Sequence, residues 1–278
     1  MKASRVVHRS VLVLCLTAIT ASVFAQAQPP KGQFEPQVGQ QGKDVVWVPT
    51  PQVLVDKMLD MAKVTPDDYV IDLGSGDGRT VITAVKRGAR ALGIEYNPDM
   101  VELSKHNAAS EGVADRAEFV NADLFESDFS RATVITMFLL PDINLKLRPR
   151  ILDLEPGTRI VSNSFTMGEW AADETATVNE GCSSWCTALF WIVPAQVEGS
   201  WRLPQGELTL KQEFQMVSGT LTSGSGSTSI TEGRLRGDQI SIRVGGAQYT
   251  GRASGDAMQG TVTSGASSSQ WSATRAGK

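Results

Sequence analysis

Apolar and polar positions follow two different rhythms along this chain of 278 residues. Through residues 52–163, short apolar runs typical of buried strands alternate with segments whose apolar positions recur every three or four residues, as on one face of a helix. This alternation predicts an α/β fold, a parallel sheet with helices on both faces. The expected helices are 52–62, 79–87, 99–111 and 142–152, and the expected strands are 69–73, 90–95, 116–121, 133–139 and 158–163.

Two further apolar runs, residues 175–178 and 187–193, are separated by a short loop containing Gly and Ser and predict an antiparallel hairpin that ends at Pro194. Beyond it the period changes to two, with turns rich in Gly, Ser and Asp. That pattern predicts a small all-β domain over residues 196–278, built as an antiparallel sheet or a small barrel. Its Gly237-Asp238 and Gly255-Asp256 pairs suit tight hairpins.

The most informative motif follows the first expected strand, where Asp72 is followed by glycines at 74, 76 and 78. Glycines in a strand-to-helix turn permit positive φ angles and let a ligand approach the backbone closely. A nicotinamide dinucleotide site requires a further glycine at the position of Arg79, so an oxidoreductase is disfavoured. A carboxylate at Asp72 suits the ammonium and sulfonium charges of S-adenosylmethionine. The turn therefore predicts an adenosylmethionine site.

Two more strand ends supply acids at positions that complete such a site. Glu95 ends the second expected strand and is placed to accept hydrogen bonds from ribose hydroxyls. Asp123 follows the third strand and could accept from the adenine amino group, although capping a turn is a common role for Asp there. The predicted cofactor-binding residues are Asp72, Gly74, Ser75, Gly76, Gly78, Glu95, Tyr96, Ala122 and Asp123.

These motifs resemble those of the class I, seven-strand S-adenosylmethionine-dependent methyltransferases. Residues 48–59, which begin Val-Pro-Thr-Pro, and residues 138–149 are similar to a subfamily that includes protein-lysine methyltransferases of mitochondrial membrane proteins and bacterial relatives. The resemblance covers residues 46–194 and implies a Rossmann-like seven-stranded sheet with an antiparallel terminal hairpin. It also implies a lid from Thr50-Pro51 over the methionine end of the cofactor.

The methyl acceptor and the catalytic residues are not identified by the sequence. A protein side chain, with lysine favoured, or a small molecule is expected, whereas a net charge of -4 without a basic stripe argues against nucleic acid. Asn144 is a candidate for positioning the acceptor, with an ordinary helix residue as the alternative. His106 is expected to be a non-catalytic helix residue, and no metal site is expected. An exported binding protein that keeps the fold without chemistry is the competing hypothesis.

The N-terminus predicts export. Lys2, Arg5 and Arg9 precede an apolar run at 11–24, which indicates a general secretory signal peptide over residues 1–25, with an uncleaved anchor as the weaker alternative. A flexible lead-in is expected over residues 26–45. In the mature chain Cys182 and Cys186 are expected to form a local disulfide, with two reduced cysteines as the alternative. The β domain either recruits a partner or covers an edge of the enzyme.

Overall fold

The structure is a computed structural model that describes residues 34–224 and 226–277. The expected signal peptide and the first part of the expected lead-in, up to residue 33, lie outside the described residues. Among the described residues, no helix is both long and apolar enough to span a bilayer.

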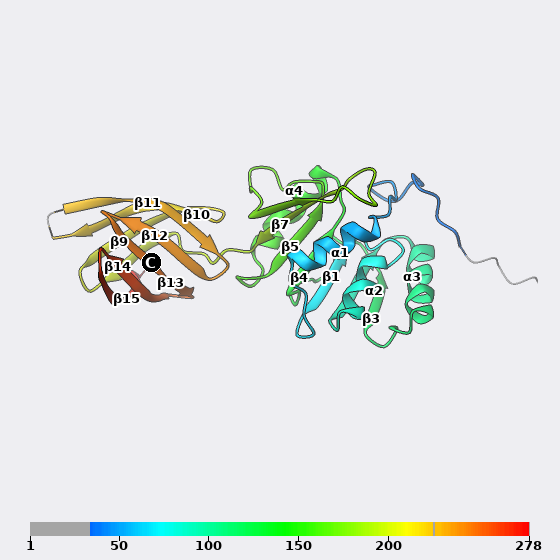
Figure 1. Cartoon of the computed structure of the whole chain (residues 1–278), viewed down its shortest axis with the longest axis horizontal. Coiled ribbons are helices and arrows are strands. Elements are labelled where there is room, and N and C mark those ends of the chain that lie inside the picture. Colours follow the sequence, from blue (N-terminus) through cyan, green and yellow to red (C-terminus); the bar gives the residue numbers. More distant parts are fainter. Residues whose placement is uncertain (1–33, 225, 278) are drawn as a thin grey trace, which may run out of the picture. The chain divides into compact units, whose positions relative to one another are not determined.

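A seven-stranded sheet forms the first part of the fold, with strand order β3-β2-β1-β4-β5-β7-β6 (Figure 1). β1 to β5 run parallel, and β7 pairs antiparallel with both β5 and β6. The predicted seven-stranded sheet with its terminal hairpin is therefore confirmed. The elements are α1 (Gln52–Met61), β1 (Tyr69–Leu73), α2 (Arg79–Lys86), β2 (Arg90–Glu95), α3 (Pro98–Ser110), β3 (Ala117–Asn121), β4 (Val134–Met137), α4 (Pro141–Leu152), β5 (Arg159–Asn163), β6 (Glu174–Thr177) and β7 (Thr187–Ile192).

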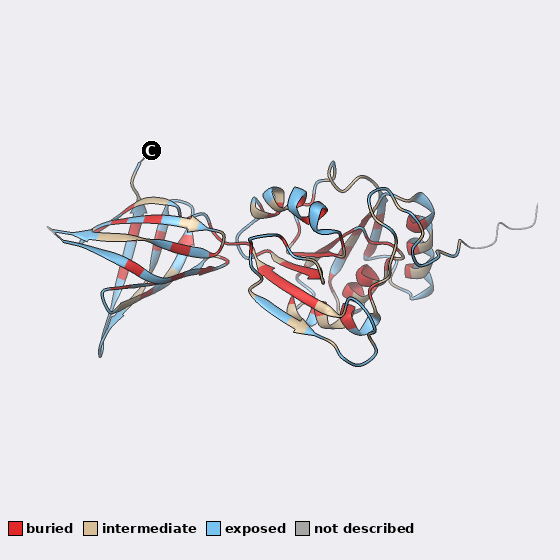
Figure 2. Ribbon diagram, turned by 90° about the horizontal axis from the view of Figure 1, so that it is seen from above, coloured by how far each residue is buried: buried red, intermediate tan, exposed pale blue. Residues whose placement is uncertain are grey.

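Helices cover both faces of this sheet, since its central strands carry apolar side chains on both faces that must be buried. In β1, Val70 packs into the core formed with α1, α2 and α3, whereas its neighbour Ile71 packs into the core formed with α4. Val161 and Ile160 of β5 divide in the same way. Figure 2 shows these strands buried while the outer faces of the helices are exposed.

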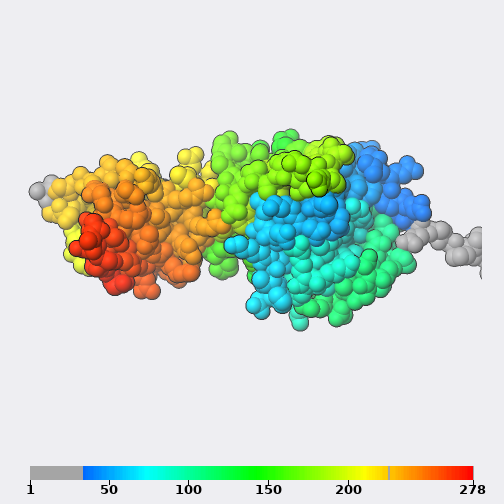
Figure 3. All heavy atoms as spheres, viewed as in Figure 1, coloured from blue at the N-terminus to red at the C-terminus, as the bar shows by residue number. Residues whose placement is uncertain are grey.

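The segment before α1 includes the last part of the expected flexible lead-in, residues 39–45. Residues 39–50, called the strap below, fold back on themselves: the Gly39 N–H donates to the Trp47 carbonyl at 2.8 Å, and Gln41 and Val46 form an antiparallel bridge. In the space-filling view this blue segment lies against the unit built by the sheet and its helices (Figure 3). Residues 39–45 of the strap belong to the expected lead-in, and in the structure they make backbone hydrogen bonds to residues 46 and 47 or to one another.

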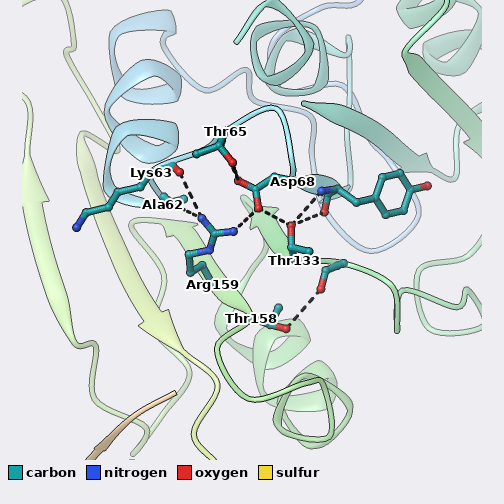
Figure 4. A network of polar contacts seen from close by, with 9 residues as sticks. Ala62, Lys63, Thr65, Asp68, Thr133, Thr158 and Arg159 are labelled. Atoms are coloured by element: carbon teal, nitrogen blue, oxygen red, sulfur yellow. Dashed lines mark hydrogen bonds and ion pairs between the residues drawn. The ribbon is translucent and has the colours of Figure 1, made fainter. Parts of the chain in front are cut away.

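The amino-terminal edge of the sheet is held by a polar network around Asp68 (Figure 4). The Asp68 carboxylate accepts from the Thr133 hydroxyl at 2.7 Å and from the Thr65 N–H at 2.8 Å, and it pairs with the guanidinium of Arg159. Arg159 also donates to the Ala62 carbonyl at 2.6 Å. These contacts join the starts of β1, β4 and β5 to the end of α1, which leaves the opposite edge free for a site.

The second part of the fold is a closed antiparallel barrel with strand order β10-β11-β12-β13-β14-β15-β8-β9. Alternate residues fill its core, as in β12, where Ile240 and Ile242 are buried and Gln239 and Arg243 are exposed. Of the two predicted architectures, the barrel is the one observed, and the two Gly-Asp pairs form its two-residue turns. Its strands are β8 (Gly199–Leu203), β9 (Gly206–Glu213), β10 (Met216–Ser223), β11 (Gly226–Arg236), β12 (Gln239–Val244), β13 (Ala247–Ser254), β14 (Ala257–Ser264) and β15 (Ser267–Arg275).

Candidate functional site

A cavity of about 580 Å³ lies at the carboxyl-terminal edge of the parallel strands. It is lined by residues that follow β1, β2, β3, β4 and β5, by the strap, and by the loop between β6 and β7. Open α/β sheets bind ligands at this edge, and the volume falls in the range of small-molecule sites, roughly 300–1,000 Å³.

The glycine turn forms one wall of the cavity, and two of its glycines are required by contacts there. Gly74 and Gly76 have φ angles of 79° and 54°. A Cβ atom added at Gly74 would lie 3.0 Å from the Leu139 side chain, and one at Gly76 would lie 2.7 Å from Nε1 of Trp47. Side chains at these positions would therefore fill the space between the turn and its neighbours.

Gly78, predicted to contact the cofactor, is not among the lining residues. It is the N-cap of α2 with a φ angle of 82°, and a Cβ atom there would lie 2.8 Å from the Phe119 ring. The structure accounts for this glycine through the turn and the close packing beneath it, without a ligand.

Ser75 also lines the cavity, and it holds a hydroxyl in need of a partner. Its Oγ is buried and has no hydrogen-bond partner within residues 34–224 and 226–277. Gly93 of β2 makes room for this side chain, because a Cβ atom there would lie 2.5 Å from the Ser75 Oγ. Buried hydroxyls are normally satisfied, so the orphaned Oγ suits a polar group of a bound molecule.

Asp72 is a buried carboxyl at the end of β1, in the cavity wall. Burial raises its pKa from 3.8 to about 7, hydrogen bonds from Thr136 and Thr80 oppose the rise, and the negative charges of Glu95 and Asp77 add to it. The Thr136 hydroxyl donates to Asp72 at 2.7 Å. A cationic ligand nearby would stabilise the ionised Asp72 carboxylate and offset the cost of burying its charge.

Glu95 ties the second strand end to the glycine turn. One carboxylate oxygen accepts from the Gly76 N–H at 3.0 Å, and the other accepts from the Asn97 N–H at 2.9 Å. Each oxygen retains acceptor capacity, because a carboxylate oxygen can accept more than one hydrogen bond. The sequence-predicted acid is thus fixed in the cavity lining by two backbone groups.

Asp123 makes the turn-capping contact considered for it, and it also lies in the cavity wall. It lines the cavity, and one oxygen accepts from the Phe125 N–H at 2.8 Å, which is a turn-capping contact. The other oxygen pairs with Lys43 of the strap, whose ammonium also lies 4.8 Å from the centroid of the Tyr96 ring. Tyr96 and Ala122 line the same region.

The structure adds lining residues that the sequence did not identify. Lys43 and Trp47 come from the strap, and Phe138, Phe165 and Trp185 follow β4, follow β5 and precede β7, respectively. Trp47 is the sequence feature that could have shown that the strap belongs to the site, because large aromatic side chains are seldom left in flexible segments.

The remaining candidates lie outside this lining. Asn144 is buried and donates to the carbonyl oxygens of Phe165 and Thr166 at 3.3 and 3.1 Å. His106 is an exposed residue of α3. Cys182 and Cys186 are disulfide-bonded, which confirms the favoured pairing. In the part of the chain that the structure describes, no three His, Cys, Asp or Glu side chains form a group that could hold a metal ion.

Comparisons with known proteins agree with this geometry. A family model described as the ANTKMT methyltransferase domain matches residues 72–174. A protein-lysine N-methyltransferase of Saccharolobus islandicus is 44% identical over 140 residues, which cover 49% of this chain and 87% of that protein. The chain belongs to the class I S-adenosylmethionine-dependent methyltransferases.

Two further relatives of this methyltransferase differ in their named substrates. The adenine nucleotide translocase lysine N-methyltransferase of Mus musculus is 33% identical over 129 residues, which cover 46% of this chain and 55% of that protein. A crystal structure has been solved of an RNA methyltransferase from Salinibacter ruber in complex with S-adenosyl-L-homocysteine. Its sequence is 48% identical to this chain, the TM-score is 0.51, and the match covers 54% of this chain and 96% of that one.

The cavity fits S-adenosylmethionine, the cofactor of this methyltransferase. The glycine turn leaves room for a ligand, the buried Ser75 hydroxyl has no hydrogen-bond partner within residues 34–224 and 226–277, and the carboxyl groups of Asp72 and Glu95 lie in the cavity wall, which suits a ligand that carries cationic and hydroxyl groups. When bound, the cofactor supplies an electrophilic methyl group, which passes to an acceptor atom as the carbon–sulfur bond breaks.

Proposed function

We propose that this enzyme methylates the amino group of a lysine side chain in a protein. The observation that carries the proposal is the 44% identity to a protein-lysine N-methyltransferase across 87% of that protein. Lysine must lose a proton before it can act as a nucleophile, and an apolar environment lowers the pKa of an amine. The cavity lining at Phe138, Leu139 and Leu140 is apolar in this way.

We further assign the cofactor contacts to the lining residues. Asp72 would hold the ammonium group, Glu95 the ribose hydroxyls, and Tyr96, Ala122 and Asp123 the adenine. The backbone of Gly74, Ser75 and Gly76 would lie against the ligand, with Gly78 supporting the turn. These assignments are supported by the position of the residues, all of which line the same cavity except Gly78.

RNA is the second candidate acceptor, because the Salinibacter ruber protein is described as an RNA methyltransferase and is 48% identical. The formal net charge of -4 disfavours it, since nucleic-acid binding depends on neutralising phosphates with Lys and Arg.

A labelling experiment separates these acceptors. Purified enzyme is incubated with tritiated S-adenosylmethionine and an extract of the source cells, and the product is divided between protease and ribonuclease. Label that protease releases and ribonuclease does not, recovered as methyllysine after acid hydrolysis, supports the proposal. Label in RNA or in a small molecule refutes it. The Asp72→Asn variant controls for label that does not depend on the site.

We also propose that the protein is exported, with a mature chain that starts near Gln26, and that the barrel recruits the protein acceptor. The basic and apolar pattern of residues 2–24 and the Cys182–Cys186 disulfide support export, since disulfides persist in oxidising compartments. The barrel's own hydrophobic core supports a separate role for it. Cell fractionation with N-terminal sequencing tests export, and full-length protein in the cytosol would contradict it.

A further inference from the structure

Three aromatic rings meet at the mouth of the cavity. The Phe138 ring stacks on the Phe165 ring with centroids 5.8 Å apart, and it lies 6.0 Å from the Trp185 ring at a tilted angle. All three residues line the cavity. Phe138 and Phe165 are half-buried, whereas the Trp185 side chain is 45% exposed.

The topology places these rings at the end of the cavity away from the nucleoside contacts. Phe138 follows β4, Phe165 follows β5, and Trp185 precedes β7, whose residue Ala188 pairs with Asn163 at the end of β5. Glu95 ends β2 and Asp123 follows β3, and these two strands lie on the other side of β1. The aromatic cluster therefore lies where an acceptor would enter, and the acids lie where the cofactor's nucleoside would bind.

The backbone of two residues of the cluster is constrained. The backbone of Phe165 is held through its carbonyl oxygen, which accepts from the Ser162 hydroxyl at 2.7 Å and from Asn144. Trp185 sits inside the loop closed by the Cys182–Cys186 disulfide and has a φ angle of 51°. A bulky residue in the left-handed region persists only where its surroundings fix it, and such residues cluster at functional sites.

The chemistry of this cluster fits a lysine side chain. Aromatic walls carry no charge and accept the methylene chain of the lysine. They also make the charged form costly to bury, which favours the neutral amine that attacks a methyl group.

We propose that Phe138, Phe165 and Trp185 form the binding site for the acceptor lysine, and that the disulfide-closed loop, residues 182–186, positions Trp185 in it. This rests on the proposed lysine methyltransferase function and assigns residues to its acceptor end. Reduction of the disulfide then weakens acceptor binding while leaving the cofactor end intact.

The test uses the enzyme from Gln26 to its C-terminus, with total protein from the source cells as the acceptor probe, and it measures methyllysine formation at limiting acceptor. Trp185→Ala is expected to lower the initial rate about tenfold, through the loss of ring contacts to the methylene chain of the lysine. Raising the acceptor concentration should recover most of that loss, and Trp185→Phe should restore the rate to within about twofold of the wild type. Ser183→Ala, in the same loop with an exposed side chain, is the matched control.

Two further measurements distinguish acceptor binding from folding and from the redox state. Binding of S-adenosylhomocysteine, followed by calorimetry, should be the same for Trp185→Ala and the wild type. Dithiothreitol should slow the wild type, and the Cys182→Ser/Cys186→Ser double variant should be slow with or without it.

The outcomes separate this inference from the function on which it rests. A wild type that binds S-adenosylhomocysteine but yields no methyllysine overturns both. A wild type that forms methyllysine while Trp185→Ala keeps its rate at limiting acceptor overturns the acceptor site alone. So does a Trp185→Ala variant whose rate loss is matched by an equal loss of cofactor affinity.

Discussion

Asp72 should destabilise the cofactor-free enzyme at neutral and alkaline pH. Its pKa in the folded protein is raised to about 7 from an ordinary 3.8, with burial as the largest cause. Between these two values the folded protein holds a proton that the unfolded chain has released. Stability therefore falls as the pH rises through this window, and the full penalty is present above pH 7.

The size of this penalty follows from the shift. At about 1.4 kcal/mol per pKa unit, moving from 3.8 to about 7 corresponds to about 4 kcal/mol of destabilisation above the window. Asp72→Asn removes the charge and keeps an oxygen for the Thr136 hydroxyl, so the variant should be about 2–4 kcal/mol more stable than the wild type at pH 8. Below pH 4 the two proteins should be equally stable.

The same substitution should weaken the cofactor site. Losing a charged partner for the ammonium group is expected to cost about 2 kcal/mol, or roughly 30-fold in the Kd for S-adenosylmethionine. Binding to the wild type between pH 6 and 7 should release a proton, which calorimetry in buffers of different ionisation enthalpy detects.

Urea denaturation of the cofactor-free protein at pH 4, 6 and 8 provides the decisive assay, with Asp115→Asn at an exposed position as the control. A stability difference between Asp72→Asn and the wild type that stays constant across these pH values would refute the linkage. An Asn variant that gains stability at pH 8 and still binds cofactor as the wild type does would refute the assignment of the ammonium contact.

Three other substitutions test separate parts of the fold and site. Gly78→Ala should lower the free energy of unfolding, measured by urea denaturation, by about 3 kcal/mol, and the control Gly112→Ala should lower it by about 1 kcal/mol. Both glycines have positive φ angles, but only a Cβ atom at position 78 meets a neighbour. Equal losses would show that packing plays no part. Asp68 has a lowered pKa, because hydrogen bonds from Thr133 and Thr65 and the Arg159 ion pair outweigh the effect of burial. Asp68→Asn should therefore cost about 2 kcal/mol at pH 7, with the difference shrinking as the pH falls below 3.8; a difference independent of pH would argue against it. Glu95→Gln should raise the Kd for S-adenosylmethionine about tenfold in calorimetry, and an unchanged Kd would remove Glu95 from the ribose contact. The variant should also lose about 1–2 kcal/mol of stability, because the amide nitrogen of Gln cannot accept the hydrogen bond that Gly76 or Asn97 donates to the second carboxylate oxygen.

The sequence predicted those parts of the site that depend on local pattern. Strand ends place Asp72 and Glu95 at one edge whatever the rest of the chain does, so their positions could be predicted from the alternation of elements. Gly78 shows the limit of that reasoning, because a glycine needed for packing against Phe119 has the same sequence appearance as one needed for a ligand.

The other residues of the site depend on contacts that no local pattern encodes. Lys43 reaches Asp123 across 80 positions of the chain. Trp185 joins Phe138 only because β7 returns antiparallel beside β5. The barrel could be predicted as antiparallel from its period of two, but its closure depends on the pairing of β15 with β8, between distant parts of the domain.

The network around Asp68 (Figure 4) and the cavity at Asp72 lie at opposite ends of the same strand, β1. Side chains at one end set how firmly the strands are joined, and side chains at the other end set what the cavity binds. The two ends therefore differ in what a substitution changes: one at the Asp68 end alters the stability of the scaffold without touching the cavity, whereas one at Asp72 alters stability and binding together, because this carboxyl is both buried and part of the cavity wall.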